Sequence, residues 1–390
     1  MNTKELDDEF VLHSYARRAI VFTHGVNATL YDENGCDYID FTAGIGVSSV
    51  GHGNEKLLAA ISDQTAKIIH CSNLYLNSAQ AQLAATLVRL CEIDGRCFFA
   101  NSGAEANEGA IKIARKYGEK RGRYKIITLA NSFHGRTIAT LKATGQPKFH
   151  EHFAPFPDGF VYAEDLAGVE PLIDDLTAAV MIEPVQGEGG VTALNKNELT
   201  KLAKILRDRD ILLIADEIQC GVFRSGNFLA GKTLGISPDV ITLAKGLAGG
   251  VPIGAVITNR KDVFEYGDHG STFGGNLLSS CGALAVLDVL EALQKSGKLA
   301  LTINHFSTQC ALIATDFPRL FTGETGLGLM RALITVDEKT QKAIIDKAHD
   351  HGVLVLRAGN NQVRLLPPLT ITNAEIDEGF SRLAAVCRAL

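Results

Sequence analysis

One lysine of this 390-residue chain lies in a segment with few other polar residues. Lys245 follows an apolar run at residues 240–244, and a glycine-rich stretch separates it from a second apolar run at residues 253–257. This pattern predicts a tight bend between two buried strands. An ammonium group on such a bend is poorly solvated, which lowers its pKa and makes the neutral amine available for a Schiff base with an aldehyde. The alternative is a lysine that extends from a loop into solvent.

A carboxylate is predicted at the end of another apolar strand. Asp216 follows residues 211–215, which are too apolar to solvate it, so its charge needs a cationic partner. A protonated pyridine nitrogen would serve and would keep the ring an electron sink. A Mg²⁺ ion and a buried salt bridge are the alternatives.

Small residues follow a third apolar run, at residues 97–100. Ser102, Gly103 and Ala104 are expected to open a helix, where free N–H groups and the helix dipole suit a phosphate. The lack of a Gly-x4-Gly-Lys-Ser/Thr motif argues against a nucleoside triphosphate. A plain helix cap by Ser102 is the alternative.

Two further segments that follow predicted strands carry groups able to bind a ligand. Phe133 offers an aromatic face for a ring, and Arg136 offers a guanidinium for a carboxylate. Glu183 and Glu188 lie in a glycine-rich segment, where solvent-facing positions are equally possible, and such a loop can move. These features fit pyridoxal 5′-phosphate, because one sheet would carry, in order, a site for a phosphate, an aromatic ring, a strand-end aspartate and a loop lysine.

Short apolar stretches separated by amphipathic segments position these residues. Strands are predicted at residues 97–100, 124–129, 178–182, 211–215 and 240–243, with helices between them such as 104–120 and 197–208. This alternation is typical of an α/β fold with a mainly parallel central sheet flanked by helices. Ligands of such sheets bind beyond the carboxyl ends of the strands, where the residues above are predicted to lie.

The remaining segments predict a smaller α+β domain built from both ends of the chain. We expect an antiparallel meander at residues 21–40, helices at 55–69, 79–90 and 284–293, and strands at 330–335, 353–356 and 362–365. The predicted organisation is an N-terminal part of the small domain (1–50), a large cofactor-binding domain (51–283) and a C-terminal small domain (284–390).

Composition limits the partners of the chain. A net charge of −6 and a pI near 6.0 argue against nucleic acid or an anionic membrane, since both need a basic patch. No signal-type segment or long apolar stretch is evident, so a cytoplasmic location is expected. The eight cysteines form no Cys-x-x-Cys pair, and the two His-x-His pairs lack a third ligand, so no metal site is predicted.

Seven motifs together resemble the class III (ω-amino-acid) aminotransferases of fold type I, most closely the acetylornithine and succinylornithine aminotransferases. The resemblance covers nearly the whole chain. The matching segments are Ser-Gly-Ala-Glu-Ala-Asn (102–107), Phe-His-Gly-Arg-Thr (133–137), Glu-Pro-Val-Gln-Gly-Glu (183–188), Asp-Glu-Ile-Gln (216–219), Leu-Ala-Lys-Gly (243–246), Ser-Thr-Phe-Gly-Gly-Asn (271–276) and Arg-Leu-Leu-Pro-Pro (364–368).

The resemblance implies a role for each matching residue around pyridoxal phosphate and the substrate. It assigns the Schiff base to Lys245, the ring nitrogen to Asp216, the ring hydroxyl to Gln219, ring stacking to Phe133, and the phosphate to Ser102, Gly103, Ala104 and, from a neighbouring subunit, Thr272. It assigns the distal carboxylate to Arg136, the α-carboxylate of glutamate to Arg364 with Glu188 as its switchable partner, and a further substrate contact to Ser271.

The resemblance also implies a homodimer with active sites at the subunit interface. The expected reaction moves the δ-amino group of an N-acylated ornithine such as N2-acetylornithine to 2-oxoglutarate, in arginine biosynthesis. Free ornithine, succinyl-diaminopimelate and γ-aminobutyrate are alternative donors, and an aminomutase or a non-catalytic binding protein are alternative functions. Arg331 replaces a usual apolar residue of the family and is expected either at the surface or facing the substrate.

Overall fold

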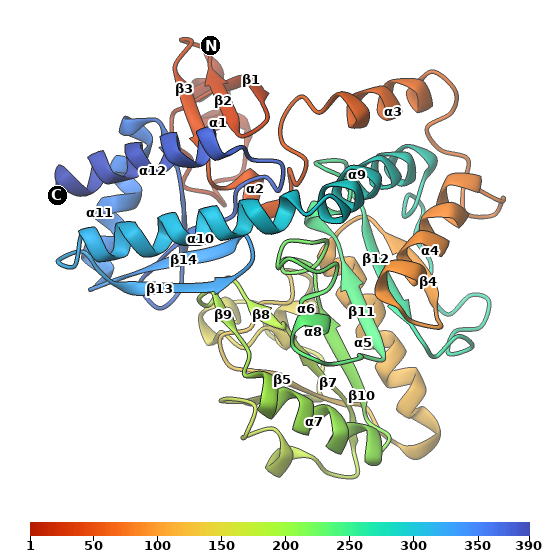
Figure 1. Cartoon of the computed structure of the whole chain (residues 1–390). Coiled ribbons are helices and arrows are strands. Elements are labelled where there is room, and N and C mark those ends of the chain that lie inside the picture. Colours follow the sequence, from red (N-terminus) through yellow and green to blue (C-terminus); the bar gives the residue numbers. More distant parts are fainter.

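The computed structural model describes residues 1–390 and is built around a seven-stranded sheet (Figure 1). The strand order is β4-β12-β11-β10-β7-β5-β6. The strands are β4 (Arg96–Ala100), β5 (Lys125–Leu129), β6 (Phe160–Ala163), β7 (Thr177–Ile182), β10 (Leu212–Asp216), β11 (Val240–Leu243) and β12 (Gly254–Thr258). The mainly parallel sheet and its five predicted strands are confirmed.

Strand β12 is the antiparallel member of this sheet, because it pairs in the antiparallel sense with both β11 and β4. The connection from Leu243 to Gly254 is too short for the helical crossover that a parallel pair requires. The bend that bears Lys245 therefore joins two antiparallel neighbours.

Helices cover both faces of the sheet, as a doubly wound fold requires. One face packs against α5 (Gly103–Gly118) and the other against α7 (Lys196–Asp208). Successive side chains of the fully buried strand β7 point to opposite faces of the sheet. Ala179 and Met181 pack on the face covered by α5, and Val180 and Ile182 pack on the face covered by α7. Burial of one such large side chain stabilises the fold by about 1.5–3 kcal/mol.

Two four-stranded sheets lie outside the central one. The first contains the predicted meander β1 (Phe22–Val26), β2 (Thr29–Asp32) and β3 (Asp37–Asp40), joined by β15 (Val353–Leu354). The second contains β13 (Phe321–Leu327), β14 (Met330–Thr335), β17 (Gln362–Leu365) and β16 (Leu356–Ala358). Because β15 pairs with β3, we propose that residues 1–50 and 284–390 form one smaller domain beside a large domain at residues 51–283.

The single strand predicted at residues 353–356 is wrong. The chain changes sheets at Val355, so that β15 pairs with β3 and β16 pairs with β17. A continuous apolar run does not reveal such a change, because both halves bury similar side chains.

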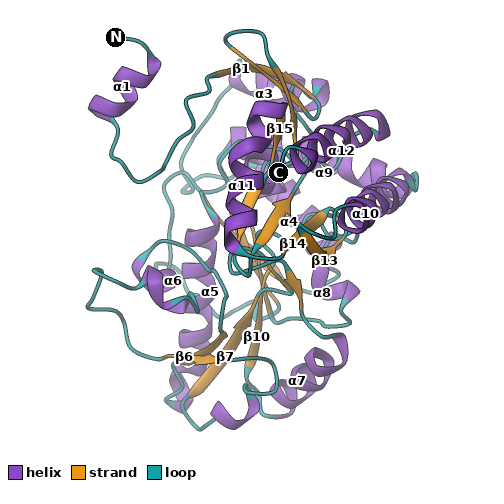
Figure 2. Cartoon of the chain, turned by 90° about the vertical axis from the view of Figure 1, so that its left-hand side faces the viewer, coloured by secondary structure: helices purple, strands orange, loops and turns teal.

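The other helices and the remaining two-stranded sheet complete the fold. They are α1 (Thr3–Phe10), α2 (Ala43–Gly46), α3 (Glu55–Thr65), α4 (Ser78–Cys91), α6 (Ile138–Ala143), α8 (Ala230–Thr233), α9 (Leu277–Lys295), α10 (Lys298–Asp316), α11 (Glu338–Ala348) and α12 (Asn373–Arg388), with strands β8 (Val185–Gln186) and β9 (Thr192–Ala193). Figure 2 shows α1 standing away from the body of the molecule, and none of its residues is buried.

Two helix boundaries differ from the prediction by four residues or more. Helix α3 ends at Thr65 rather than at residue 69, and α9 begins at Leu277, seven residues before the predicted start at 284. The Asn276 side chain accepts a hydrogen bond from the N–H of Ser279 and caps α9. Helix α9 is the one helix long and apolar enough to span a membrane, but it packs against α3, α4 and α10, as core helices of this composition do.

Candidate active site

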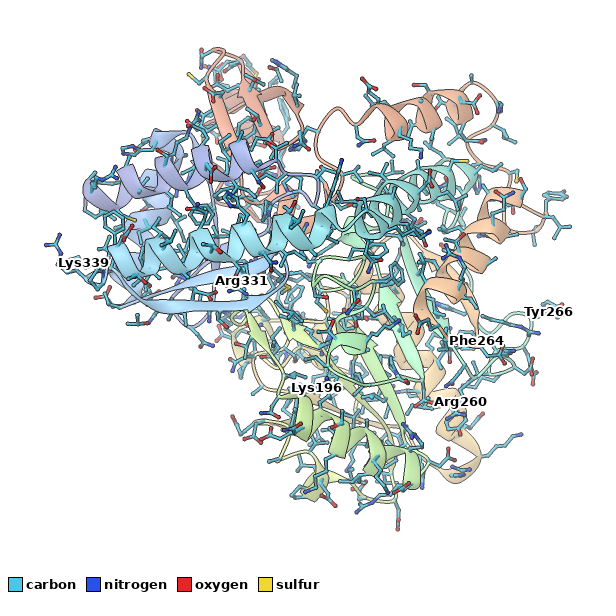
Figure 3. The ribbon with its side chains drawn as sticks, viewed as in Figure 1. Lys196, Arg260, Phe264, Tyr266, Arg331 and Lys339 are labelled. Atoms are coloured by element: carbon cyan, nitrogen blue, oxygen red, sulfur yellow. The ribbon has the colours of Figure 1, made fainter.

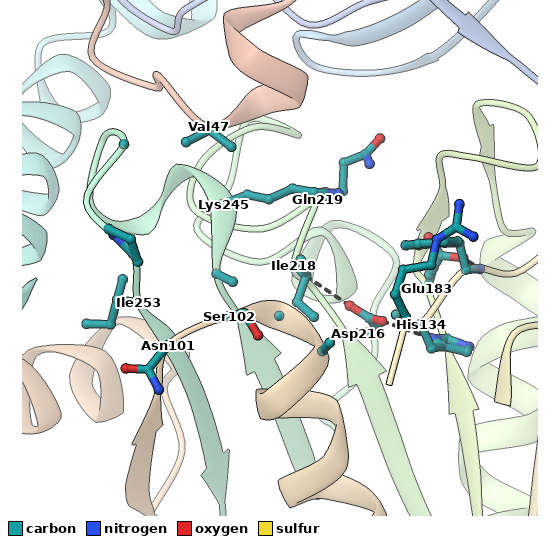
Figure 4. Close-up of a pocket in the computed structure, with 18 of the residues that line it drawn as sticks. Val47, Asn101, Ser102, His134, Glu183, Asp216, Ile218, Gln219, Lys245 and Ile253 are labelled. Atoms are coloured by element: carbon teal, nitrogen blue, oxygen red, sulfur yellow. Dashed lines mark hydrogen bonds and ion pairs between the residues drawn. The ribbon is translucent and has the colours of Figure 1, made fainter. Parts of the chain in front are cut away.

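A cavity of about 340 Å³ opens at the carboxyl ends of the central strands (Figure 4). Its volume falls in the range of small-molecule sites, roughly 300–1,000 Å³. The lining residues are Val47, Asn101, Ser102, Gly103, Ala104, Phe133, His134, Gly135, Arg136, Glu183, Asp216, Ile218, Gln219, Ala244, Lys245, Gly250, Val251, Pro252 and Ile253. Eight of the twelve predicted site residues are therefore in one cavity, namely Ser102, Gly103, Ala104, Phe133, Arg136, Asp216, Gln219 and Lys245.

Lys245 directly follows Ala244 at the end of β11 and extends into this cavity toward Gln219 (Figure 4). Its φ of +43° is uncommon for a residue with a side chain, and it is held by the turn that follows, where Ser49 Oγ donates to the carbonyl of Gly246 at 2.6 Å. Burial lowers the pKa of Lys245, although the negative charge of Glu188 opposes this shift. The sequence predicted a lowered pKa for a lysine on this bend, and the direction of the shift is confirmed.

Asp216 is held by two residues that sequence reasoning did not assign to the site. Its Oδ2 atom lies 2.8 Å from His134 Nδ1 and accepts a hydrogen bond of 2.7 Å from Asn107 Nδ2, while Oδ1 accepts from the N–H of Ile218 at 3.1 Å. Asn107 Nδ2 also donates to the carbonyl of His134 at 2.7 Å. No lysine or arginine forms an ion pair with Asp216, so a cation within the cavity would be its natural charge partner.

His134 could have been assigned to the site from the sequence, because it directly follows Phe133 in the motif at residues 133–137. Asn107 lies one turn into α5 and ends the motif at residues 102–107, but a polar residue at that position of a helix is normally expected to face solvent. Both are buried, at 2% and 0% exposure.

The first turn of α5 offers a site for a phosphate. Ser102 caps the helix by accepting from the N–H of Glu105 at 3.2 Å, which leaves the N–H groups of Gly103 and Ala104 without intrahelical acceptors at the cavity wall. A Cβ atom at Gly103 would lie 2.9 Å from the side chain of Ile218. Glycine is therefore required at this position by close packing against the residue that follows Asp216 and Glu217.

An aromatic face and a free guanidinium lie at another wall of the cavity. Phe133 packs edge-on against Phe149, with ring centroids 5.9 Å apart, and the Arg136 guanidinium lies 4.2 Å from the centroid of Phe149. Arg136 is exposed and forms no ion pair within the chain, so it remains available to a carboxylate.

Glu183 is buried in the cavity wall, which corrects its interpretation as a possible solvent-facing acid. It is 5% exposed, and its Oε2 accepts from the N–H of Phe133 at 2.9 Å. Burial raises the pKa of Glu183 well above its ordinary value, and the nearby charge of Asp216 raises it further. Glu217, also buried, accepts from the N–H groups of Gly231 at 2.6 Å and Ala230 at 2.9 Å, and burial raises its pKa to about 7.

Glu188 and Arg364 do not line the cavity but lie behind Gln219, which does. Arg364 Nη1 is 2.8 Å from Glu188 Oε1 and donates to Gln219 Oε1 at 3.0 Å. The Arg364 side chain is 2% exposed and that of Glu188 is 30% exposed. Burial opposes ionisation of Glu188, but the Arg364 guanidinium more than compensates, and the pKa of Glu188 is lowered.

Ser271 and Thr272 also do not line the cavity of their own chain, although Ser271 Oγ accepts a hydrogen bond of 3.3 Å from Nδ2 of Asn101, which does. Ser271 is tied to the neighbouring loop, because its carbonyl accepts from Asn73 Nδ2 at 2.8 Å, whereas Thr272 is exposed. Arg331 is also outside the cavity and is not at the open surface: it forms an ion pair with Glu324 across β13 and β14 and lies beside α10 in Figure 3.

Comparisons with known proteins show the family of the chain. The family model Aminotransferase class-III matches residues 11–387. The chain is 56% identical to an acetylornithine aminotransferase of Wolinella succinogenes over 99% of both chains, and 43% identical to one of Aquifex aeolicus over 97% of this chain and 99% of that one. The chain belongs to the class III aminotransferases, a family that depends on pyridoxal phosphate.

Solved structures of aminotransferases are also similar to this chain. An ornithine aminotransferase of Toxoplasma gondii superposes with a TM-score of 0.92 at 30% identity, covering 100% of this chain and 96% of that one. An N-acetylornithine aminotransferase of Stenotrophomonas maltophilia gives a TM-score of 0.82 at 33% identity, covering 96% and 97%.

Proposed function

We propose that this aminotransferase moves the δ-amino group of N2-acetylornithine, or of a similar N-acylated ornithine, to 2-oxoglutarate in arginine biosynthesis. The observation that carries the proposal is the contrast between two arginines: Arg136 is unpaired, while Arg364 is paired with Glu188. N2-acetylornithine has one carboxylate, distal to its reacting amine, whereas glutamate has a second carboxylate beside the amine. One free and one reversibly paired guanidinium match this pair of substrates.

The residues of the cavity fit pyridoxal phosphate. The N–H groups of Gly103 and Ala104 would hold the phosphate, with Ser102 capping their helix, and Asp216 would face the ring nitrogen. Phe133 would lie against the ring and Gln219 at its hydroxyl. When bound, the cofactor supplies an aldehyde that accepts the amino group and a ring that withdraws electrons.

Lys245 supplies the proton chemistry. Its lowered pKa makes the neutral amine accessible, so that Nζ can act as a nucleophile toward the cofactor and then as the base that takes a proton from the amine-bearing carbon. The buried His134 and Asn107 keep the carboxylate of Asp216 oriented into the cavity while this occurs.

Glu188 and the two arginines would distinguish the substrates. With an acylated ornithine bound, Arg136 holds the distal carboxylate and Glu188 stays on Arg364, so that no unpaired guanidinium faces the apolar chain. With glutamate or 2-oxoglutarate bound, the α-carboxylate replaces Glu188 on Arg364.

A homodimer is part of the proposal. Thr272 lies next to an exposed apolar patch formed by Leu74, Tyr75, Leu76 and Phe273, which are 60–104% exposed. Asn73 fixes this loop by donating to the carbonyls of Ser271 and Gly274, at 2.8 and 3.0 Å. A second copy on this patch would bury it, and the partner's Thr272 would reach the phosphate site. We also propose a cytoplasmic location, where both small substrates are expected.

A panel of amino donors assayed with 2-oxoglutarate tests the proposed reaction. N2-acetylornithine, N2-succinylornithine, free ornithine, succinyl-diaminopimelate and γ-aminobutyrate are compared by kcat/KM. The highest value is expected for an N-acylated ornithine. A higher value for free ornithine or γ-aminobutyrate would replace the proposed substrate, and no turnover with any donor would favour a binding protein.

A further inference from the structure

The loop that bears Glu188 has little space in which to move. A Cβ atom at Gly187 would lie 2.2 Å from Gln219 Oε1, and one at Gly189 would lie 2.1 Å from the carbonyl oxygen of Asn131. The glycines of this loop therefore permit close packing rather than motion, contrary to the expectation from their number in the sequence.

The hairpin formed by β16 and β17 holds this loop at Glu188 and at the residues that follow it. The N–H of Gly359 donates to the carbonyl of Glu188 at 3.0 Å, and a Cβ atom at Gly359 would lie 2.4 Å from the carbonyl oxygen of Gly189. Beyond the loop, the N–H of Val191 donates to Gln362 Oε1 at 2.5 Å, and Gln362 is 5% exposed.

The same hairpin carries Arg364. Gln362 and Arg364 are two residues apart on β17 and therefore project from the same face of the strand. Gln341 of α11, which is 1% exposed, fixes the hairpin by donating through Nε2 to the carbonyls of Ala358 and Gln362, each at 2.7 Å. The backbone of Glu188 and the strand of Arg364 are thus parts of one rigid assembly.

We propose that Gly359 and Gln362 are positioning residues that hold the Glu188 backbone at a fixed distance from Arg364, so that substrate exchange moves only the Glu188 side chain. This inference rests on the proposed function. The partly exposed Glu188 side chain has solvent into which to turn, whereas the buried Arg364 does not. A displaced backbone would weaken the pair and leave Arg364 free for an α-carboxylate.

Equilibrium binding of glutarate, a five-carbon dicarboxylate, to the holoenzyme tests this inference. Gly359→Ala should lower the Kd of glutarate by roughly three- to tenfold, because a weakened Glu188 contact competes less for Arg364. The KM for N2-acetylornithine should rise in the same variant. General damage to the site would weaken the binding of both ligands, so opposite changes identify a positioning role.

Two further variants complete the experiment. Gln362→Leu removes the acceptor for the N–H of Val191 and should likewise lower the Kd of glutarate and raise the KM for N2-acetylornithine. This variant tests the positioning role if Gly359→Ala does not fold. Gly168→Ala is the matched control, because its Cβ would meet the nearest atom at an ordinary 3.5 Å, and it should leave both constants unchanged.

Glu188→Ala distinguishes failure of the positioning inference from failure of the proposed function. If it tightens glutarate binding while Gly359→Ala and Gln362→Leu leave the Kd unchanged or raised, the positioning inference is overturned and the proposed function stands. If Glu188→Ala itself changes neither glutarate binding nor the KM of the acylated donor, the proposed role of the Glu188–Arg364 pair fails.

Discussion

The Nδ1 atom of His134 lies 2.8 Å from Oδ2 of Asp216, and the side chains of both residues are almost fully shielded from solvent. Asn107 donates to the same oxygen and also to the carbonyl of His134. The strand-end carboxylate is therefore fixed in orientation before any ligand binds. Charge-assisted contacts of this kind contribute about 1.5–3 kcal/mol each.

We expect His134→Ala to weaken cofactor binding by roughly tenfold to a hundredfold, because Asp216 loses one of the contacts that orient it toward the ring nitrogen. His134→Asn should retain most of the affinity, since its amide N–H can take the place of Nδ1. Titration of the apoprotein with pyridoxal phosphate, followed by absorbance, measures both dissociation constants. Equal affinity in wild type and His134→Ala would show that the contact has no role in holding Asp216.

Lys245→Ala should bind the cofactor without a covalent bond and turn over donors at a negligible rate, because the phosphate and ring contacts remain while the base is lost. Borohydride reduction of the wild type, followed by peptide mapping, should find the pyridoxyl group on Lys245. Lys232 and Lys261, which form surface ion pairs with Glu92 and Asp94, serve as internal controls. A label on either of them would contradict the assignment.

Glu188→Ala should slow the half-reaction with the acylated donor and spare that with glutamate, since Arg364 then faces the apolar chain without a negatively charged partner. The ratio of the two kcat/KM values should fall by roughly ten- to a hundredfold. Stopped-flow measurement of each half-reaction gives this ratio. Glu338→Ala, which removes an exposed partner of Arg357, is the control and should leave it unchanged. Equal losses in both half-reactions would reject the switch.

Glu217 should make stability depend on pH. Its pKa rises from 4.5 to about 7 on folding, so the folded protein keeps a proton that the unfolded chain releases between these values. The contribution of this proton to the free energy of unfolding is fully present below pH 4.5. It is lost as the pH rises toward 7, and the loss is on the order of 3 kcal/mol.

Glu217→Gln should remove this dependence. Its unfolding free energy relative to wild type should improve between about pH 5 and pH 8, even if the loss of one hydrogen bond lowers its absolute value. Urea unfolding at a series of pH values measures the difference, with the exposed Glu265→Gln as control. Parallel pH profiles for wild type and Glu217→Gln would contradict the raised pKa.

The sequence by itself determined which residues meet at the site. Apolar runs marked the strands, and the residues that follow parallel strands converge because the carboxyl ends lie at one edge of the sheet. For this reason Ser102, Phe133, Asp216 and Lys245 could be grouped before any coordinates were known, and the cavity contains all of them.

The tertiary structure alone decided how these residues are held. His134 is 82 positions from Asp216, so no local pattern reports this contact, whereas the pairing of Glu188 with Arg364, 176 positions apart, was expected only from the family resemblance. The same limit explains the burial of Glu183, the pairing of Arg331 with Glu324, and the close packing of the Glu188 loop. Periodicity reports which face of an element is apolar, whereas the partner of a buried polar group depends on which distant segment packs against it.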